Sequence, residues 1–284
     1  MCGEIVNTPG VAAPIQELIL SQPIDIPVFH EVALRLQQML NDNSYRIEEV
    51  IKLVHEDTAL ASEMLRCANT TYNSGKAPIT TIKDAIVRLG SQQIVNLAFT
   101  ASMSHSKSDD PIVNRYFKNN WYHCHAVAIS SAWLAVQIIN DQKPLEIDAD
   151  EVYLVGLFHE IGKLYLLKSI DKLIKEGLFR AETSLIDNFI DDHYALQSVK
   201  VMRHYNMPSI YIMASERHAT KQILDPDDHL LAITRLSCKM HDFVINGIKA
   251  IEAVDDVESE LSLLNMDLNY VYDFVKSITE SNWL

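Results

Sequence analysis

The chain has 284 residues, 48% of them hydrophobic and 22% charged, which is the composition of a globular protein with a sizeable core. Its 8 glycines and 9 prolines are too few for a disordered, collagen-like or turn-dense all-β chain. With 24 basic and 38 acidic side chains the formal net charge is -14, and a surface this negative repels phosphate backbones, which excludes broad binding to nucleic acids.

The first part of the chain has the periodicity of short amphipathic helices. Pro27 suits a first helical turn, and apolar residues then recur at spacings of three and four over Phe29–Met39. Asp57 is a predicted N-cap, and the helix that follows it stops at Asn73–Gly75. A further short helix, Ile82–Leu89, ends at a glycine, and the serine after that glycine can cap the next helix.

The polar stretch His105–Pro111 is the best internal boundary. It divides an N-terminal helical part, 1–110, from a helical core with a C-terminal extension, 111–284. No segment shows sustained period-two alternation, so the predicted fold class is all-α. In the second part we expect helices over Pro111–Ile139 (with a possible break at Asn119–Asn120), Ala149–Leu167 and Ser184–Tyr205, one opening near Pro208, one through Ile245, an acidic connector Asp255–Glu260, and an amphipathic tail Leu268–Ile278.

Cysteine usage and the N-terminus indicate a reducing compartment. Cys2, Cys67, Cys124 and Cys238 are scattered without any C-x-x-C spacing. The first residues lack a secretory signal, and apolar stretches such as Ala126–Ile139 are too short to span a bilayer. We therefore expect a soluble, cytoplasmic protein without a membrane role.

The sharpest local feature is Gly156–Leu164, which carries His159, Glu160 and Lys163. A phosphate-binding P-loop needs four residues between its glycines, whereas five stand here, and a zincin needs a second histidine where Lys163 stands. The remaining interpretation is an adjacent His–acid pair that shares a metal with histidines of neighbouring helices. The histidines placed to join it are His123, His193 and His218.

Taken in order, these segments resemble the HDOD family. The similarity covers roughly residues 20–220. Each motif alone is weak evidence, but the set of motifs in this order is specific to the family. The matching segments are Ile26-Pro27, Val54–Leu60, Ala85–Gly90, Trp121 with His123, Gly156–Leu164, His193, Tyr205–Pro208 and Glu216–His218. The resemblance implies a multi-helix, HD-like orthogonal bundle preceded by an N-terminal helical subdomain. HDOD proteins are degenerate relatives of the HD superfamily, whose metal-dependent phosphohydrolases use a His…His-Asp…Asp ligand set.

The resemblance also implies a ligand set, with two departures. His123 matches the first superfamily histidine and His159 the histidine of the pair, but Glu160 stands where that pair has aspartate. Cys238 aligns with the final aspartate, so a thiol replaces a carboxylate. His193 and His218 match histidines that related phosphodiesterases use for a second metal. A thiolate ligand favours zinc or iron over magnesium, and manganese is the third ion we consider.

Each candidate also has a structural interpretation. Glu160 can pair with Lys163 at i+3 as a solvated helix contact. His193 and His218 can be structural or partly exposed, and Cys238 can be a small buried apolar residue. Lys163 and Arg217 can contact a phosphate if a nucleotide binds, or can be surface charges. His125 points about 200° away from His123 on the helix, so at most one of the two faces the core.

Two functions follow from these expectations. The first is a bacterial signalling or regulatory HDOD module that is not catalytic and binds a partner signalling protein or a small regulatory nucleotide. The alternative is a metal-dependent phosphohydrolase, a phosphodiesterase or nucleotidase of the HD superfamily. The two altered ligand positions favour the first, because replacing a hard carboxylate and moving another by one methylene weakens water activation. The sequence does not fix the oligomeric state.

Overall fold

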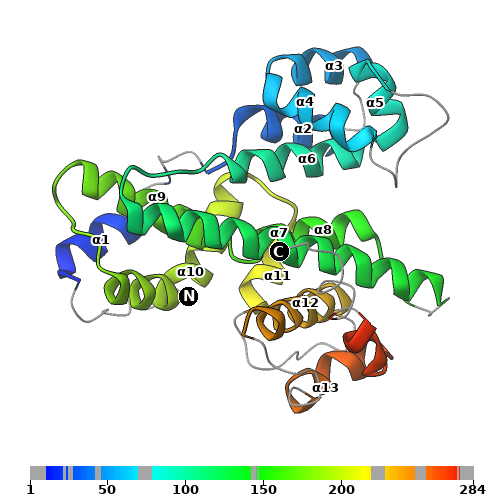
Figure 1. Ribbon diagram of the computed structural model, residues 1–284. Coiled ribbons are helices and arrows are strands. Elements are labelled where there is room, and N and C mark those ends of the chain that lie inside the picture. The colour runs from blue at the N-terminus through cyan, green and yellow to red at the C-terminus, as the bar shows by residue number, and fades with distance from the viewer. Residues whose placement is uncertain are drawn as a thin grey trace. The chain divides into compact units, whose positions relative to one another are not determined.

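The protein is built of α-helices, and no strand occurs among the residues that the structure describes (Figure 1). The computed structural model describes residues 11–21, 24, 28–41, 46–69, 79–141, 145, 147–218, 228–246, 254–273 and 275. The predicted all-α class is confirmed. The helices are α1 (Ala13–Ser21), α2 (Glu31–Asn41), α3 (Ile47–His55), α4 (Thr58–Ala68), α5 (Ile82–Leu89), α6 (Ser91–Ser104), α7 (Pro111–Asn140), α8 (Ala149–Phe158), α9 (Ile161–Lys175), α10 (Thr183–His204), α11 (Ser209–His218), α12 (His229–Asn246) and α13 (Val254–Leu263).

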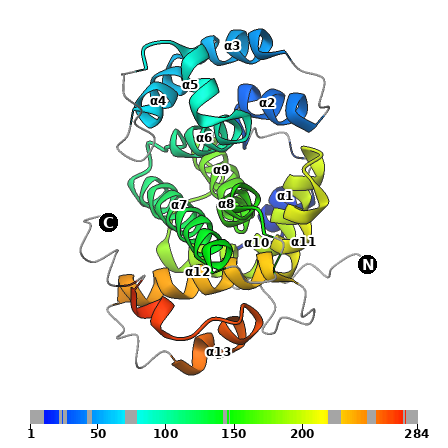
Figure 2. The ribbon, with the colours of Figure 1, turned by 90° about the vertical axis from the view of Figure 1, so that its right-hand side faces the viewer.

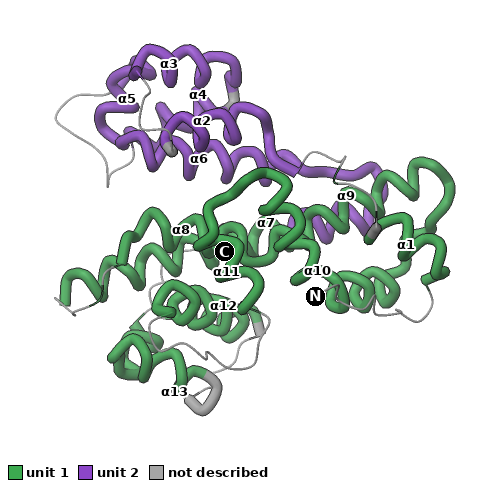
Figure 3. Tube along the Cα trace, turned by 180° about the vertical axis from the view of Figure 1, so that it is seen from behind, with its two compact units in different colours: residues 1–24, 119–284 green, residues 25–118 purple. Residues whose placement is uncertain are grey.

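The chain divides into two compact units, 25–118 and 1–24 together with 119–284 (Figure 3). This division differs from the expected boundary between residues 110 and 111. The reason is that α7 runs without a break through that region, Asn119–Asn120 included. The first helix belongs with the larger unit, in which Lys200 on α10 donates a hydrogen bond to the carbonyl of Leu20 (2.9 Å).

The smaller unit confirms the predicted cap at Asp57 and the predicted end of Ile82–Leu89 at a glycine. Asp57 accepts a hydrogen bond from the amide three residues later, as an N-cap does, and Thr81 caps α5 in the same way. Gly90 follows α5 with φ of 82°, a conformation that favours glycine. Gly90 is itself the N-cap of α6, so the cap predicted at Ser91 is wrong by one residue.

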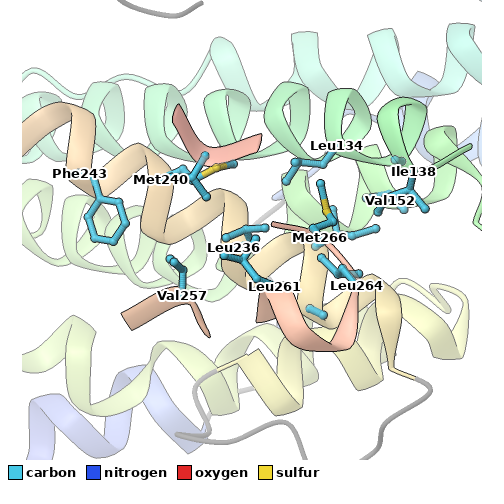
Figure 4. Close-up of a cluster of buried hydrophobic side chains, with 14 residues drawn as sticks. Leu134, Ile138, Val152, Leu236, Met240, Phe243, Val257, Leu261, Leu264 and Met266 are labelled. Atoms are coloured by element: carbon cyan, nitrogen blue, oxygen red, sulfur yellow. The ribbon is translucent and has the colours of Figure 1, made fainter. Parts of the chain in front are cut away.

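The larger unit has one cluster of buried apolar side chains where α12 and α13 meet α7 and α8 (Figure 4). Figures 1 and 2 both show α13 alongside α12. The acidic connector predicted over Asp255–Glu260 is wrong, because that segment lies within α13. Val257 and Leu261 recur one turn apart and are buried, which holds the helix in place despite its acidic composition. The tail is helical over 269–273 and at 275.

The long helix α7 is by length and composition able to cross a membrane. The apolar stretch of α7 is therefore longer than Ala126–Ile139, the stretch that the sequence indicated to be too short to span a bilayer. The core helix of a globular bundle meets the same criteria, and Cys124, Val127, Ala128 and Leu134 of α7 are fully buried.

Some sequence predictions lie outside the described residues. These are Pro27, Asn73–Gly75, the N-terminal residues with Cys2, and the tail beyond residue 275. Cys67, Cys124 and Cys238 form no disulfide within the described part of the chain.

Candidate metal centre

Four segments of the larger unit bring potential metal ligands together. His123 comes from α7, His159 and Glu160 from the turn between α8 and α9, His218 from the end of α11, and Cys238 from α12. The structure therefore gathers five of the six residues predicted as ligands.

The turn at His159 and Glu160 interrupts a helix predicted to run unbroken over Ala149–Leu167. The imidazole of His159 bonds to the carbonyl of Gly156 (2.7 Å), and the Ser215 hydroxyl donates to the carbonyl of Phe158 (3.2 Å). These side chains take acceptors that a continuous helix would use for its own amides, so the helix ends and restarts. The prediction of one helix is wrong for this reason.

Two glycines let this turn sit deep between helices. A Cβ atom on Gly156 would lie 2.8 Å from the Cα atom of Ala128 on α7. A Cβ atom on Gly162 would lie 2.1 Å from the carbonyl oxygen of Tyr194 on α10. Both glycines are therefore required by close backbone approach, one on each side of the His-Glu pair.

Three donor atoms form the most compact group, which we call the inner set: Nε2 of His123, Nε2 of His159 and Sγ of Cys238. The two nitrogens are 3.2 Å apart, and the sulfur lies 3.4 Å from His123 and 3.2 Å from His159. A tetrahedral ion with ordinary Zn–N and Zn–S bonds separates its ligand atoms by about 3.3 to 3.6 Å. The separations of the inner set, 3.2 to 3.4 Å, lie close to this spacing, so its residues fit a transition metal ion.

The partner of His159 fixes which of its nitrogens can bind a metal. Its Nδ1 atom donates to the carbonyl of Gly156, because a carbonyl oxygen can only accept. A neutral imidazole then has its lone pair on Nε2, the atom that belongs to the inner set. Metal-binding histidines commonly hold their second nitrogen in this way.

Glu160 is held mainly by a lysine. Its Oε2 atom lies 2.7 Å from Nζ of Lys163, 3.5 Å from Nε2 of His123 and 4.0 Å from Nε2 of His159. The predicted i+3 pair is present, but it is buried rather than solvated, since the glutamate side chain is only 9% exposed. The ammonium group of Lys163 also lies 4.8 Å from the centre of the Tyr194 ring.

His218 is the least satisfied member of the cluster. Its ring packs edge-on against His159, with 4.5 Å between centroids. Both of its ring nitrogens are buried and have no hydrogen-bond partner within the described part of the chain. A ligand atom of His218 lies within 4.8 Å of ligand atoms of His159 and Glu160. Buried polar atoms without partners are unusual, and a ligand would satisfy them.

Burial keeps most of these groups neutral in the metal-free chain. It lowers the pKa of His159, with His123 adding to the effect, and lowers the pKa of His218. Burial raises the pKa of the Cys238 thiol, and nearby Glu160 raises it further. Burial alone would also raise the pKa of Glu160, but the positive charge of Lys163 outweighs it and lowers that pKa. The site is thus one carboxylate–ammonium pair beside neutral nitrogen and sulfur ligands.

The other candidates have other partners. His193 is buried on α10 against the ring of Phe189 (4.8 Å between centroids) and joins none of the ligand groups found in the described residues. Arg217, a predicted phosphate contact, pairs with Asp228 at 2.7 Å. Lys163, the other predicted phosphate contact, is engaged by Glu160.

The sequence analysis missed His241 and Asp242. Nδ1 of His241 lies 3.1 Å from Nδ1 of His123, and both missed residues form a ligand group with that histidine. Their spacing could have revealed them, because they follow Cys238 by three and four residues and so lie on the same face of α12 as Cys238.

Comparison with known proteins places the fold in one family. The model of the HDOD domain matches residues 26–220. A solved HDOD domain protein of unknown function from Geobacter sulfurreducens is 16% identical, with a TM-score of 0.65 over 90% of each chain. A protein from Shewanella amazonensis SB2B, provisionally named a metal-dependent phosphohydrolase, is 21% identical, with a TM-score of 0.66 over 89% of this chain and 91% of that one.

Two further matches add context. A provisionally named signal transduction protein from Marinobacter aquaeolei VT8 is 17% identical, with a TM-score of 0.60 over 90% of this chain and 57% of that one. An uncharacterised protein of Treponema pallidum (strain Nichols) is 21% identical over 168 residues, which are 59% of this chain and 31% of that protein. The chain therefore spans about a third of that relative, and the likeness to the solved structures shows the fold.

Proposed function

The chain belongs to the HDOD family, and from this membership and the chemistry of its buried cluster we propose that it is a signal-transduction module that does not catalyse phosphoester hydrolysis. In this proposal the cluster is a remnant of an HD-type centre that can still bind a transition metal. The module acts through a separate partner signalling protein or a small nucleotide ligand in a bacterial cytoplasm.

One observation carries the proposal, namely the contact of 2.7 Å between Glu160 and Lys163. An HD-type hydrolase needs hard, negatively charged oxygen ligands to hold its ions and lower the pKa of bound water. In this chain the carboxylate of Glu160 is neutralised by the ammonium group of Lys163. Cys238 stands where the HD ligand set has its last aspartate. The donors left closest together are two imidazoles and a thiol, which bind an ion without supplying that charge.

The residues that would hold an ion are His123, His159 and Cys238, with His218 and Glu160 beside them. This donor set suits zinc or iron better than magnesium. Of the three transition metals considered, it suits manganese least. A bound ion would supply Lewis acidity and a cross-link between α7, α12 and the α8–α9 turn. His159 would contribute Nε2 while its Nδ1 stays on the carbonyl of Gly156.

The test is an assay of a generic phosphodiester and of nucleotides with zinc, iron, manganese or magnesium supplied. We expect the wild type and His159→Ala to show the same background rate, and His159→Ala to lose metal that the wild type retains. His193→Ala is the matched control, because it removes a buried histidine outside the cluster and should keep the metal. Turnover by the wild type that His159→Ala abolishes and His193→Ala preserves would overturn the proposal.

That overturning result would establish the second candidate, a metal-dependent phosphohydrolase. The observation that favours it is the group formed by His159, Glu160 and His218 next to the inner set. Two adjoining ligand groups are the arrangement that two-metal hydrolysis requires.

A further inference from the structure

His123 presents both of its ring nitrogens to other ligand atoms. Nε2 faces the inner set, whereas Nδ1 lies 3.1 Å from Nδ1 of His241, and the two rings meet nearly edge to face. Asp242 follows on α12, and its carboxylate lies within 4.8 Å of ligand atoms of both histidines. We call Nδ1 of His123, Nδ1 of His241 and the carboxylate of Asp242 the outer set.

We infer that the outer set is a second binding position for a divalent transition metal ion, and that it competes with the inner set for His123. Two imidazoles and one carboxylate form a donor set typical of zinc, cobalt, nickel or ferrous iron. His241 is buried, whereas Asp242 is exposed, so an ion at the outer set would be reached from solvent. His241 and Asp242 lie beyond residues 26–220, the part of the chain that the family model matches.

The hydrogen positions in the metal-free chain follow from one fixed point. His159 donates from Nδ1 to the carbonyl of Gly156, so its Nε2 carries no hydrogen. Nε2 of His123, 3.2 Å away, must then be the donor between these two rings. A neutral His123 therefore has its lone pair on Nδ1, and His241 donates to it from its own Nδ1.

This arrangement makes the two ion positions exclusive. An ion at the outer set uses the lone pair that Nδ1 of His123 already has, while His241 moves its hydrogen to Nε2. An ion at the inner set needs the lone pair on Nε2 of His123, so the hydrogen must move to Nδ1, where it points at His241. A neutral imidazole has one lone pair, and it cannot serve both positions at once.

The test titrates the metal-free full chain with Co²⁺, measuring stoichiometry by calorimetry and the thiolate-to-cobalt charge-transfer band by absorption. Cys238→Ser removes the thiolate and so weakens the inner set while leaving the outer set intact. Cys238→Ala takes its place if a buried serine unfolds the chain. Asp242→Asn removes an outer ligand, and Asp273→Asn is the matched control, because it removes one exposed carboxylate from outside the cluster.

We expect one Co²⁺ per wild-type chain and one per Cys238→Ser chain, the latter without the charge-transfer band. Adding Asp242→Asn to Cys238→Ser should weaken binding at least about tenfold, since even indirect supports of a metal ligand contribute that much. Asp242→Asn alone should keep the band, and Asp273→Asn should change nothing.

Equal Co²⁺ affinity of Cys238→Ser with and without Asp242→Asn would refute the outer position. Two ions per wild-type chain, one of which Asp242→Asn removes, would refute the exclusive sharing of His123. Because stoichiometry and absorption do not depend on turnover, hydrolysis by the wild type would overturn the proposed function and leave this inference standing.

Discussion

Two buried glutamates of the larger unit show how similar contacts serve different ends. Glu260 on α13 and Glu160 at the α8–α9 turn each lie 2.7 Å from a lysine ammonium. Glu260 also accepts hydrogen bonds from Nε of Arg235 (3.1 Å) and from the hydroxyl of Ser259 (2.8 Å). Both of its oxygens are therefore satisfied, and two cations compensate its charge.

Glu160 has one lysine and is otherwise surrounded by groups that bind metals. Its other close neighbours are the imidazoles of His123 and His159, and the ring of His218 lies nearby. We call Glu260, Arg235 and Lys239 the Glu260 trio, a closed network that fastens α13 to α12. The Glu160 cluster is open, since the buried ring nitrogens of His218 have no hydrogen-bond partner among the described residues. A closed network contributes to stability, whereas an open one is suited to binding.

The same substitution at both glutamates tests this contrast. Glu260→Gln leaves Arg235 buried without its counter-charge, because that side chain is only 10% exposed. Breaking a buried ion pair from one side costs about 3–5 kcal/mol in the free energy of unfolding. Glu160→Gln should cost less by at least about 1 kcal/mol, because Lys163 is 26% exposed and partly screened by solvent.

Urea denaturation of the metal-free proteins measures both costs. Glu258→Gln is the control, since Glu258 is exposed on the same helix as Glu260 and its replacement should leave stability unchanged. If Glu160→Gln destabilised the chain as much as Glu260→Gln, the cluster would be a structural network like the trio, and the contrast would be lost.

A glycine substitution tests whether the open cluster depends on close helix packing. In Gly162→Ala the new methyl group would stand 2.1 Å from the carbonyl oxygen of Tyr194, so α9 and α10 must move apart. Overpacking of this kind costs about 1–3 kcal/mol in unfolding free energy. The movement also displaces the His159–Glu160 turn, so we expect Co²⁺ to bind at least about tenfold more weakly.

Gly177→Ala is the matched comparison. Gly177 has φ of 73° and open space around it, so alanine there costs about 1–2 kcal/mol through backbone strain alone. Its metal affinity should equal that of the wild type. Equal Co²⁺ affinities for both variants would show that the turn does not rely on the close approach of α9 and α10.

The sequence predicted the helices well where apolar residues repeat at helical spacing. It failed at His159 and Glu160, where side chains of distant sequence position, such as Ser215, capture backbone acceptors and end a helix that periodicity would continue. It also failed over Asp255–Glu260, because an acidic stretch resembles a solvated connector until the burial of Glu260 against Arg235 is known. Both failures come from tertiary contacts that local patterns do not contain.

The candidate cluster was predicted in part for a similar reason. The resemblance supplied the order of His123, His159 and His218, and the structure brings these together. It also supplied His193, which faces Phe189 instead. His241 escaped attention because no motif marks it, although it lies one helical turn after Cys238. Convergence of side chains from separate helices is set by the packing of those helices, which the sequence shows only indirectly.

The smallest expected effect concerns Arg217, which sharpens the contrast between paired charges and ligand groups. Arg217 pairs with Asp228 at 2.7 Å, with side chains 40% and 17% exposed. A pair this accessible contributes about 0.2–1 kcal/mol, so Arg217→Ala should lower the unfolding free energy by no more than that. Because the guanidinium already has a carboxylate partner, the variant should also bind inorganic phosphate as the wild type does, measured by calorimetry. A loss of phosphate binding in Arg217→Ala would instead make this arginine part of an anion site, and the open region of the molecule would extend beyond the histidine cluster.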